Sequence, residues 1–161
     1  MAKNWKIRKD LSIEVCGHKL FRIECTQDFK EIKAGTLGGY IEKEENLSGD
    51  AWVYGSARVY DSAWVYGSAR VCDSACVYGD EIKNRYDICY ISNRYYNITI
   101  TPLHIKIGCQ YHAQEAWWNF TDKQIEKMDG QDALEFWKIW KEPLKQICNA
   151  IKKEKGDDNV E

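Results

Sequence analysis

Residues 51–80 have the sequence AWVYGS, ARVYDS, AWVYGS, ARVCDS and ACVYGD, which is a six-residue motif repeated five times. Each unit begins with Ala, has Val at its third position, and has Gly or Asp at its fifth. A period this short and strict indicates a repeat architecture, because every unit meets the same surroundings and only stacking can bury it. The invariant positions are Ala51, Ala57, Ala63, Ala69 and Ala75 together with Val53, Val59, Val65, Val71 and Val77.

The spacing of Val and Ala favours a left-handed parallel β-helix, in which three units form one triangular coil of roughly 18 residues. Val would point into the coil, and Ala would occupy a tight corner that excludes larger side chains. Gly or Asp beside the corner would tolerate left-handed backbone angles. Residues 18 apart would then stack, which places Val53 over Val71, Trp52 on Arg70, Arg58 on Cys76, Tyr54 on Cys72 and Tyr60 on Tyr78.

An antiparallel meander is the alternative, because WVYGSARVY alternates with period two and contains a Gly-Ser turn. A meander, however, gives no reason for Ala at every sixth residue. Extended backward, the period puts Ile41 and Leu47 at the Val position and Gly49 at the Gly/Asp position. Extended forward, it meets Lys83 where an apolar residue is expected, so the repeat should end near Asp80.

The flanking segments predict a chain of three parts. Residues 1–38 would form an N-terminal β-hairpin cap, with a strand pair over 5–25 and a turn at residues 16–19. Residues 39–83 would form the β-helix. Residues 84–161 would form a small antiparallel sheet over 86–107 followed by helices. The expected fold is therefore mainly β with two C-terminal helices.

The pattern after Cys109 is helical. A capping box at Thr121-x-x-Gln124 and another at Asp132-x-x-Glu135 predict two helix starts, and Asp129-Gly130 should end the first helix. Pro143 should kink or restart the second. That second helix carries one apolar face, formed by Leu134, Trp137, Trp140, Leu144, Ile147 and Ile151.

Composition excludes several classes of protein. The net charge of −2 gives no global basic field, so we expect no duplex nucleic acid partner. No stretch approaches the roughly 20 apolar residues of a membrane span, and the charged N-terminus lacks the apolar run of a signal peptide. We therefore expect a cytoplasmic protein without a membrane partner, in which the seven cysteines are free thiols.

The repeat resembles the hexapeptide family of left-handed β-helices, best known from trimeric acyltransferases. The chain matches this family at Val and Ala and departs from it beside Val, where Tyr or Cys replaces the usual small or acidic residue.

The chain also resembles small phage and prophage proteins that have an aromatic repeat block and a Gly-Cys-x-x-His helical tail. The resemblance lies in two segments, LFRIECTQDFKEIKAGTLGGYIEKEENLSGDAWVYGSARVY and IGCQYHAQEAWWNFTDKQIEKMDGQDALEFWKIWK. That resemblance implies an accessory role in infection, in the host cytosol. Several such proteins are oligomeric inhibitors of host defence, some of which sequester nucleotide signals.

The aromatic side chains on the outside of the coil would form an exposed apolar surface, which another copy of the chain could bury. We therefore predict a homo-oligomer, with three-fold symmetry as the first choice. Arginine forks suit phosphate and aromatic rings suit a base, so a nucleotide-like ligand at a cleft between subunits is the favoured specific function. The residues expected to bind it are Arg58, Arg70, Arg85, Trp52, Tyr54, Tyr60 and Trp64.

Other chemistries stay open as alternatives. Acyl transfer needs a general base, and all three His residues (His18, His104, His112) lie outside the repeat. Cys109-x-x-His112, with His104 and Cys89, is a weak metal signal that lacks a second clean pair, and Cys109 is expected to pack between sheet and helix. Residues 35–39, GTLGG, are interpreted as a turn rather than a phosphate loop.

Trp117 and Trp118 are adjacent and cannot both face inward on a helix. One of the two side chains is therefore expected at a contact, either with another copy of the chain or with a host protein. We therefore expect a non-enzymatic binding protein without a metal or cofactor, and an inhibitor that masks a host protein is the alternative.

Overall fold

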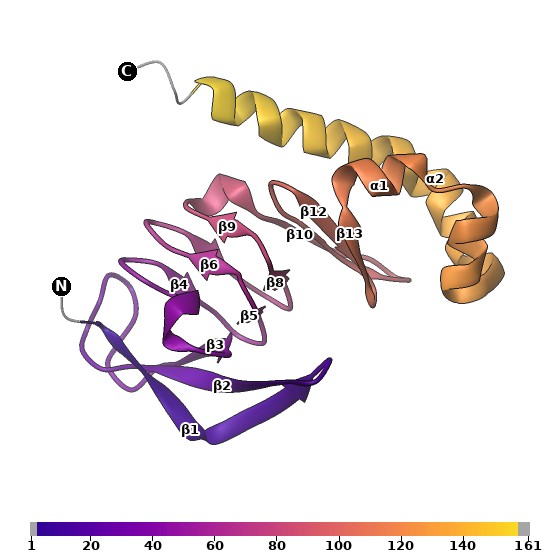
Figure 1. The fold of residues 1–161 in the computed structure, drawn as a ribbon. Helices are drawn as coiled ribbons and strands as arrows, with labels where there is room; N and C mark the ends of the chain where they lie inside the picture. Colours follow the sequence, from indigo (N-terminus) through magenta and orange to yellow (C-terminus); the bar gives the residue numbers. More distant parts are fainter. Residues whose placement is uncertain (1–2, 158–161) are drawn as a thin grey trace.

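The computed structural model describes residues 3–157, and the side chains of residues 3–153. The chain is mainly β, with several sheets and helices at its C-terminal end, which confirms the expected class (Figure 1). Among the described residues, no helix is both long enough and apolar enough to cross a membrane.

The N-terminal hairpin consists of β1 (Trp5–Val15) and β2 (His18–Cys25), which pair antiparallel. The turn between them places Cys16 and Gly17 at positive φ (50° and 84°), as the predicted strand pair requires. Strand β2 also pairs antiparallel with β3 (Leu37–Ile41). Because β3 is the first strand of the repeat region, the hairpin extends one of its faces (Figure 1).

The repeat region is a stack of coils, here called the stacked coil (residues 37–82), with three parallel ladders: β3-β5-β8, β4-β7 and β6-β9. The first two ladders pair residues 18 positions apart, as in Trp52 with Arg70 and Tyr60 with Tyr78. This pairing confirms the predicted stacking and excludes the antiparallel meander. The strands are β4 (Trp52–Val53), β5 (Arg58–Tyr60), β6 (Trp64–Val65), β7 (Arg70–Val71), β8 (Cys76–Tyr78) and β9 (Glu81–Ile82).

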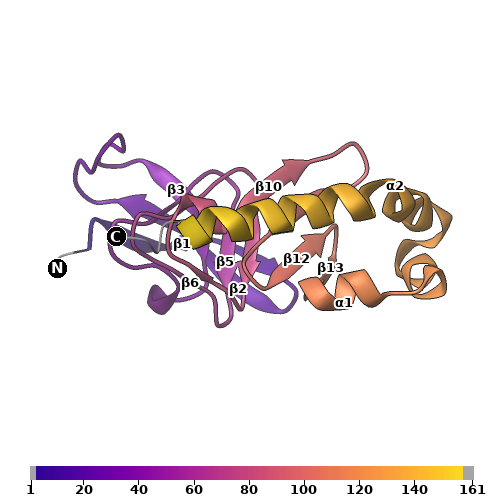
Figure 2. The ribbon, with the colours of Figure 1, turned by 90° about the horizontal axis from the view of Figure 1, so that it is seen from above.

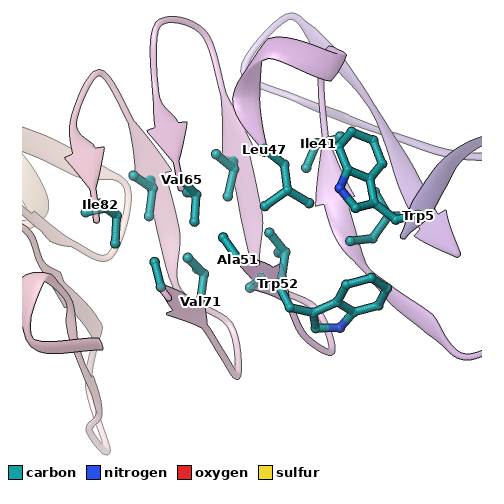
Figure 3. Close-up of a cluster of buried hydrophobic side chains, with 14 of the residues drawn as sticks. Trp5, Ile41, Leu47, Ala51, Trp52, Val65, Val71 and Ile82 are labelled. Carbon is teal, nitrogen blue, oxygen red and sulfur yellow. The ribbon is translucent and has the colours of Figure 1, made fainter. Parts of the chain in front are cut away.

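The invariant residues fill the inside of the stacked coil. All five Val residues are fully buried and the five Ala residues are at most 2% exposed. Figure 3 shows the inward column, which runs from Trp5 beside Ile41 and Leu47 at one end to Ile82 at the other. The fifth position has positive φ in the six units from residue 45 to residue 80, as predicted from its Gly or Asp: Gly49, Gly55, Asp61, Gly67, Asp73 and Gly79.

The last coil departs from the 18-residue spacing. Glu81 pairs with Trp64 and Ile82 with Val65, each 17 positions apart, so one residue is missing from the repeat. Ile82 is fully buried and takes the inward position that Lys83 fails to fill. A 3-10 turn, η2 (Arg85–Asp87), follows, and Ile88 packs on the same core. The last strand of the coil thus ends at Ile82, two residues past Asp80, because the loss of one residue shifts the period without ending the stack.

Gly38 and Gly39, which were predicted to form part of a turn, lie within strand β3. A Cβ atom at Gly38 would come within 2.6 Å of the carbonyl oxygen of Val53, and one at Gly39 within 2.6 Å of that of Ala57. Neither glycine has positive φ, so the close approach of β3 to the next coil is what requires them. Only Gly35, with φ of 82°, serves a turn.

A four-stranded antiparallel sheet follows in the order β10-β11-β12-β13. Strands β10 (Cys89–Ser92), β11 (Asn97–Ile100) and β12 (His104–Ile107) confirm the predicted sheet. The fourth strand, β13 (Gln110–Ala113), was expected to be helical. Gly108, at φ 56°, turns the chain so that Gln110 pairs back with Ile107, and pairing outweighs the local helical pattern.

Helix α1 (Gln114–Asn119) and helix α2 (Asp122–Asp157) cover this sheet (Figures 1 and 2). The capping box at Thr121 and Gln124 is formed, since each backbone N–H donates to the other side chain (2.9 and 3.3 Å). The predicted break lies at Asp129 and Gly130, and α2 continues through Pro143 without restarting. The expected apolar face packs on the sheet, with Leu134, Trp137 and Leu144 buried.

Candidate functional site

Two of the predicted ligand residues, Arg70 and Arg85, line one cleft with Tyr90. Arg70 lies on β7, and Arg85 lies one coil further along the chain, on η2. Tyr90 lies on β10, the first strand beyond the coil. The cleft has a volume of about 240 Å³ and is open to solvent. Its other lining residues are Cys72, Asp73, Ala75 and Ile88. This arginine cleft is the candidate site.

The Arg70 side chain is held in place by its neighbours. One guanidinium nitrogen donates to the carbonyl oxygen of Asp50 (3.1 Å), and the other lies 3.4 Å from a carboxylate oxygen of Glu31. Glu31 also accepts a hydrogen bond from the Tyr54 hydroxyl (2.7 Å), and that bond holds the pKa of Glu31 below its usual range. Burial, and then the bond to Glu31, raise the pKa of Tyr54 to about 12. Because the Glu31 side chain is largely exposed, solvent weakens its ion pair with Arg70.

Arg85 is exposed and its position is set by the 3-10 turn. Its guanidinium lies 4.8 Å from the ring centre of Tyr86 and donates to the Tyr86 hydroxyl (2.8 Å). The turn itself is capped by Asn84, whose side chain accepts from the Tyr86 amide (2.9 Å). The buried carboxylate of Asp87 accepts from the Lys83 amide (2.7 Å). The capped turn therefore places the Arg85 guanidinium, held on Tyr86, at the edge of the cleft.

The other predicted ligand residues are distributed over the three ladders. Arg58 lies on the ladder that the hairpin extends, between Tyr40 and Cys76, so it occupies a different face from Arg70, as expected. Trp64 is 40% exposed and stacks on Tyr66 with ring centres 4.0 Å apart. The structure thus brings Arg70, Arg85 and Tyr54 into one region and separates Arg58 and Trp64 from it.

Two aromatic residues expected on the outer surface are buried within the chain. Trp52 is 1% exposed, because Phe29 and Ile32 of the connection before β3 pack in the same apolar cluster. Tyr60 is 3% exposed and stacks on Tyr78 with ring centres 5.2 Å apart. The expectation that the outer aromatic rows are covered only by other copies was therefore wrong for these two, since segments distant in sequence cover them.

A second polar cluster, which the sequence reasoning missed, is centred on Asp80. Its carboxylate is buried and accepts from the hydroxyls of Thr101 (2.7 Å) and Tyr111 (2.9 Å) and from the Leu103 amide (3.2 Å). It also lies 2.8 Å from Nδ1 of His104. These partners belong to β12, β13 and the connection between β11 and β12, so Asp80 joins the C-terminal sheet to the coil. A signal was present, because Asp80 stands where the four earlier units have Ser.

The weak metal signal is not gathered into a cluster. In the described part of the chain, no group of three or more His, Cys, Asp or Glu side chains is placed to hold a metal ion. Cys109 is exposed at the turn between β12 and β13 rather than packed between sheet and helix. Nε2 of His112 lies 3.1 Å from the side-chain oxygen of Gln110, and burial lowers the pKa of His112.

Comparisons with known proteins give no family assignment. No family model matches the chain, and no curated protein matches it.

Proposed function

We propose that this protein is a non-enzymatic, homo-oligomeric binding protein that holds a nucleotide-like small molecule in the arginine cleft. The observation that carries this proposal is that Arg70 and Arg85 line one cleft with Tyr90, although they lie on successive levels of the chain, Arg70 in the coil and Arg85 in the 3-10 turn that follows it. Two guanidinium groups suit the oxygens of a phosphate or diphosphate, and the tyrosine ring suits the face of a base.

The setting of the proposed ligand follows from the resemblance to small phage and prophage proteins. Proteins of that kind include inhibitors that sequester nucleotide signals of host defence. We propose the same class of role for this chain, in the host cytosol. A sequestering protein needs tight binding without turnover, which two positioned guanidinium groups and a ring supply.

We also propose that the stacked coil is a left-handed β-helix of the hexapeptide type and that three copies associate. The six-residue period, the buried Ala at each corner and the positive φ beside it support this handedness. The exposed Trp64 and its stacked neighbour Tyr66 support association, because burying a flat aromatic pair against another copy of the chain is energetically favourable.

The test is calorimetric titration of the protein with a panel of mononucleotides and cyclic dinucleotides. We expect Arg70→Ala and Arg85→Ala each to weaken binding by about tenfold or more, since each removes a charge-assisted hydrogen-bonding group. Arg94→Ala is the matched control, because Arg94 is exposed, packs 6.0 Å from the ring of Tyr95 and does not line the cleft. Oligomer mass should not change in any of the three.

Two other outcomes identify the alternatives. If no nucleotide binds and a host protein co-purifies in fixed stoichiometry, the chain acts by masking that protein. If acetyl-CoA is turned over in a manner that depends on a histidine, the chain is an acyltransferase. Either result would overturn the proposal of sequestration at the arginine cleft.

A further inference from the structure

Cys72 departs from the repeat at its fourth position. The other four units of residues 51–80 have tyrosine at this position: Tyr54, Tyr60, Tyr66 and Tyr78. Because β4 pairs with β7 in an 18-residue register, Cys72 lies one coil beyond Tyr54. Cys72 also lines the arginine cleft. The unit that lacks this tyrosine is therefore the unit at which the cleft lies.

The neighbouring ladder shows what a tyrosine at this position does. Tyr60 and Tyr78 occupy the fourth position on β5 and β8, and they pair in register, 18 residues apart. Their rings stack, with centres 5.2 Å apart and an angle of 21° between their planes. A tyrosine in place of Cys72 would stand in the same relation to Tyr54, since both ladders have the same register. The cysteine therefore leaves the place of one stacked ring empty.

Other walls of the cleft are formed by the chain that follows the coil. Ile88 and Tyr90 line the cleft and pack on the apolar core of the coil, as Tyr54 does. Ala75 adds a further apolar surface. The cleft, of about 240 Å³, thus offers a place beside Cys72 that is bordered by apolar and aromatic groups and has room for a planar ring.

The Cys72 thiol is suited to contact with such a ring. Burial raises the pKa of the thiol, so it stays uncharged near neutral pH and presents a polarisable, weakly polar surface. Among the other lining residues, Arg70 and Arg85 carry positive charge and Asp73 carries negative charge. The arginines suit phosphate oxygens, whereas the sulfur suits an aromatic face or edge.

We propose that the place left by the missing tyrosine is the base subsite of the arginine cleft, so that the planar base of the ligand lies over Cys72 where other units have a tyrosine ring. This inference rests on the proposed function and deepens it, because it identifies Cys72 as the residue that admits a base. The cleft then selects a nucleotide over a phosphate compound without a ring. Restoring tyrosine should close the subsite and keep the fold, since four other units carry tyrosine at this position.

The first test is calorimetric titration of Cys72→Tyr with AMP, GMP, CMP, UMP, cyclic di-AMP and cyclic di-GMP, and with inorganic pyrophosphate, which has phosphates and no base. We expect Cys72→Tyr to weaken binding of the nucleotides by about tenfold or more, the loss of one base-stacking contact. Pyrophosphate should bind as it does to the wild-type protein, since Arg70 and Arg85 are kept. Cys109→Tyr is the matched control, because it adds the same ring at an exposed cysteine in the turn between β12 and β13.

The second test locates the ligand in the wild-type protein by alkylation with iodoacetamide. Cys16, Cys72 and Cys109 are all exposed, and of these Cys72 lines the cleft. Cys16 lies at the turn between β1 and β2 and serves with Cys109 as an internal control. A saturating nucleotide should slow the modification of Cys72 several-fold and leave the other two rates unchanged, as peptide mass spectrometry measures.

The outcomes separate this inference from the proposed function. Nucleotide affinity that is unchanged in Cys72→Tyr would overturn the base subsite and leave a nucleotide bound at the arginines. Equal losses of nucleotide and pyrophosphate binding would show that the added ring blocks the phosphates, which also overturns the subsite. A bound nucleotide that does not protect Cys72 from alkylation would place the ligand outside the cleft. If the wild-type protein binds no nucleotide, the proposed function fails and this inference fails with it.

Discussion

Asp80 shows how one residue that departs from the repeat changes its role. The other units end in Ser at this position, and those residues lie at the surface (Ser56, Ser62, Ser68 and Ser74). The Asp80 carboxylate is instead buried and bonded to three groups of the C-terminal sheet, beside His104. A buried carboxylate is tolerated only where donors surround it, so the sheet and the coil must pack together for this residue to be stable.

Replacement of Asp80 with Ser, the residue of the other units, should lower the free energy of unfolding by about 2–4 kcal/mol. It leaves the hydroxyls of Thr101 and Tyr111 and the Leu103 amide without their shared acceptor. Urea denaturation measures the change. Glu81→Gln, an exposed neighbour, should change the stability by less than about 0.5 kcal/mol. Equal effects of the two substitutions would show that the Asp80 cluster adds nothing.

His112 should make the protein sensitive to mild acid. Burial holds its pKa below the usual 6.5 in the folded state, and its ring meets the edges of Trp117 and Phe120 (centres 5.2 and 5.0 Å away). The unfolded chain therefore binds the proton more readily, so stability falls as the pH drops below about 6.5. In His112→Phe, the loss of stability between pH 7.5 and 5.5, measured by urea denaturation, should be smaller. The same loss in both proteins would contradict this assignment.

At the scale of the element, the coil depends on one backbone feature that recurs in six successive units, over residues 45–80. The fifth residue adopts positive φ, which glycine does without cost and aspartate at a small one. The space around each of these residues differs. A Cβ atom at Gly67 would lie 2.6 Å from the Lys83 carbonyl oxygen, whereas one at Gly55 would meet its nearest atom, the Asp73 carbonyl oxygen, at 3.5 Å.

Gly67→Ala should therefore destabilise the protein more than Gly55→Ala. Both substitutions put alanine at positive φ, which costs about 1 kcal/mol. Only Gly67→Ala also forces the backbone near Lys83 to move, which should bring its total to about 2–4 kcal/mol. Thermal unfolding of the two variants side by side measures the difference. Equal midpoints would mean that the missing residue in the last coil leaves the chain free to adjust there.

At the scale of the whole molecule, two large apolar cores lie side by side, and a smaller apolar cluster of Leu20, Tyr60 and Cys76 joins the hairpin to the coil. One fills the stacked coil and ends at Trp5 and Ile82, and the other lies between the four-stranded sheet and the helices. Seen from above, α2 runs along the molecule over both parts (Figure 2). The hairpin lies at one end of the coil and η2 with β10 follows the other, so the sides of the coil are its most available surface for association (Figure 1).

Replacement of Trp64 with Ser should convert the proposed trimer into monomers. Trp64 stacks on Tyr66 and donates to the Ser48 hydroxyl (2.9 Å), so it forms a rigid aromatic surface that is 40% exposed. Native mass spectrometry measures the subunit number. Ile139→Ser is the control, since Ile139 is 69% exposed on α2. A wild-type protein that is monomeric at micromolar concentration would contradict the prediction.

The stacked coil was predictable because its information is local and repeated. Each unit carries its own inward Val, its corner Ala and its residue for positive φ, so the 18-residue stacking follows from the period alone. Arg70 and Arg85 were identified as cations near the coil, but their common cleft was not, because the missing residue before η2 shifts Arg85 relative to the period.

The sequence by itself determined the period, the inward column, the hairpin and the apolar face of α2. Only the tertiary structure decided which aromatic side chains are buried, that Gly38 and Gly39 lie in a strand, and that residues 110–113 pair as β13. The physical reason is the distance along the chain over which each feature is set. Backbone angles and periodic burial depend on neighbours a few residues away, whereas the cover over Trp52 and the hydrogen bonds to Asp80 depend on segments that meet only after folding.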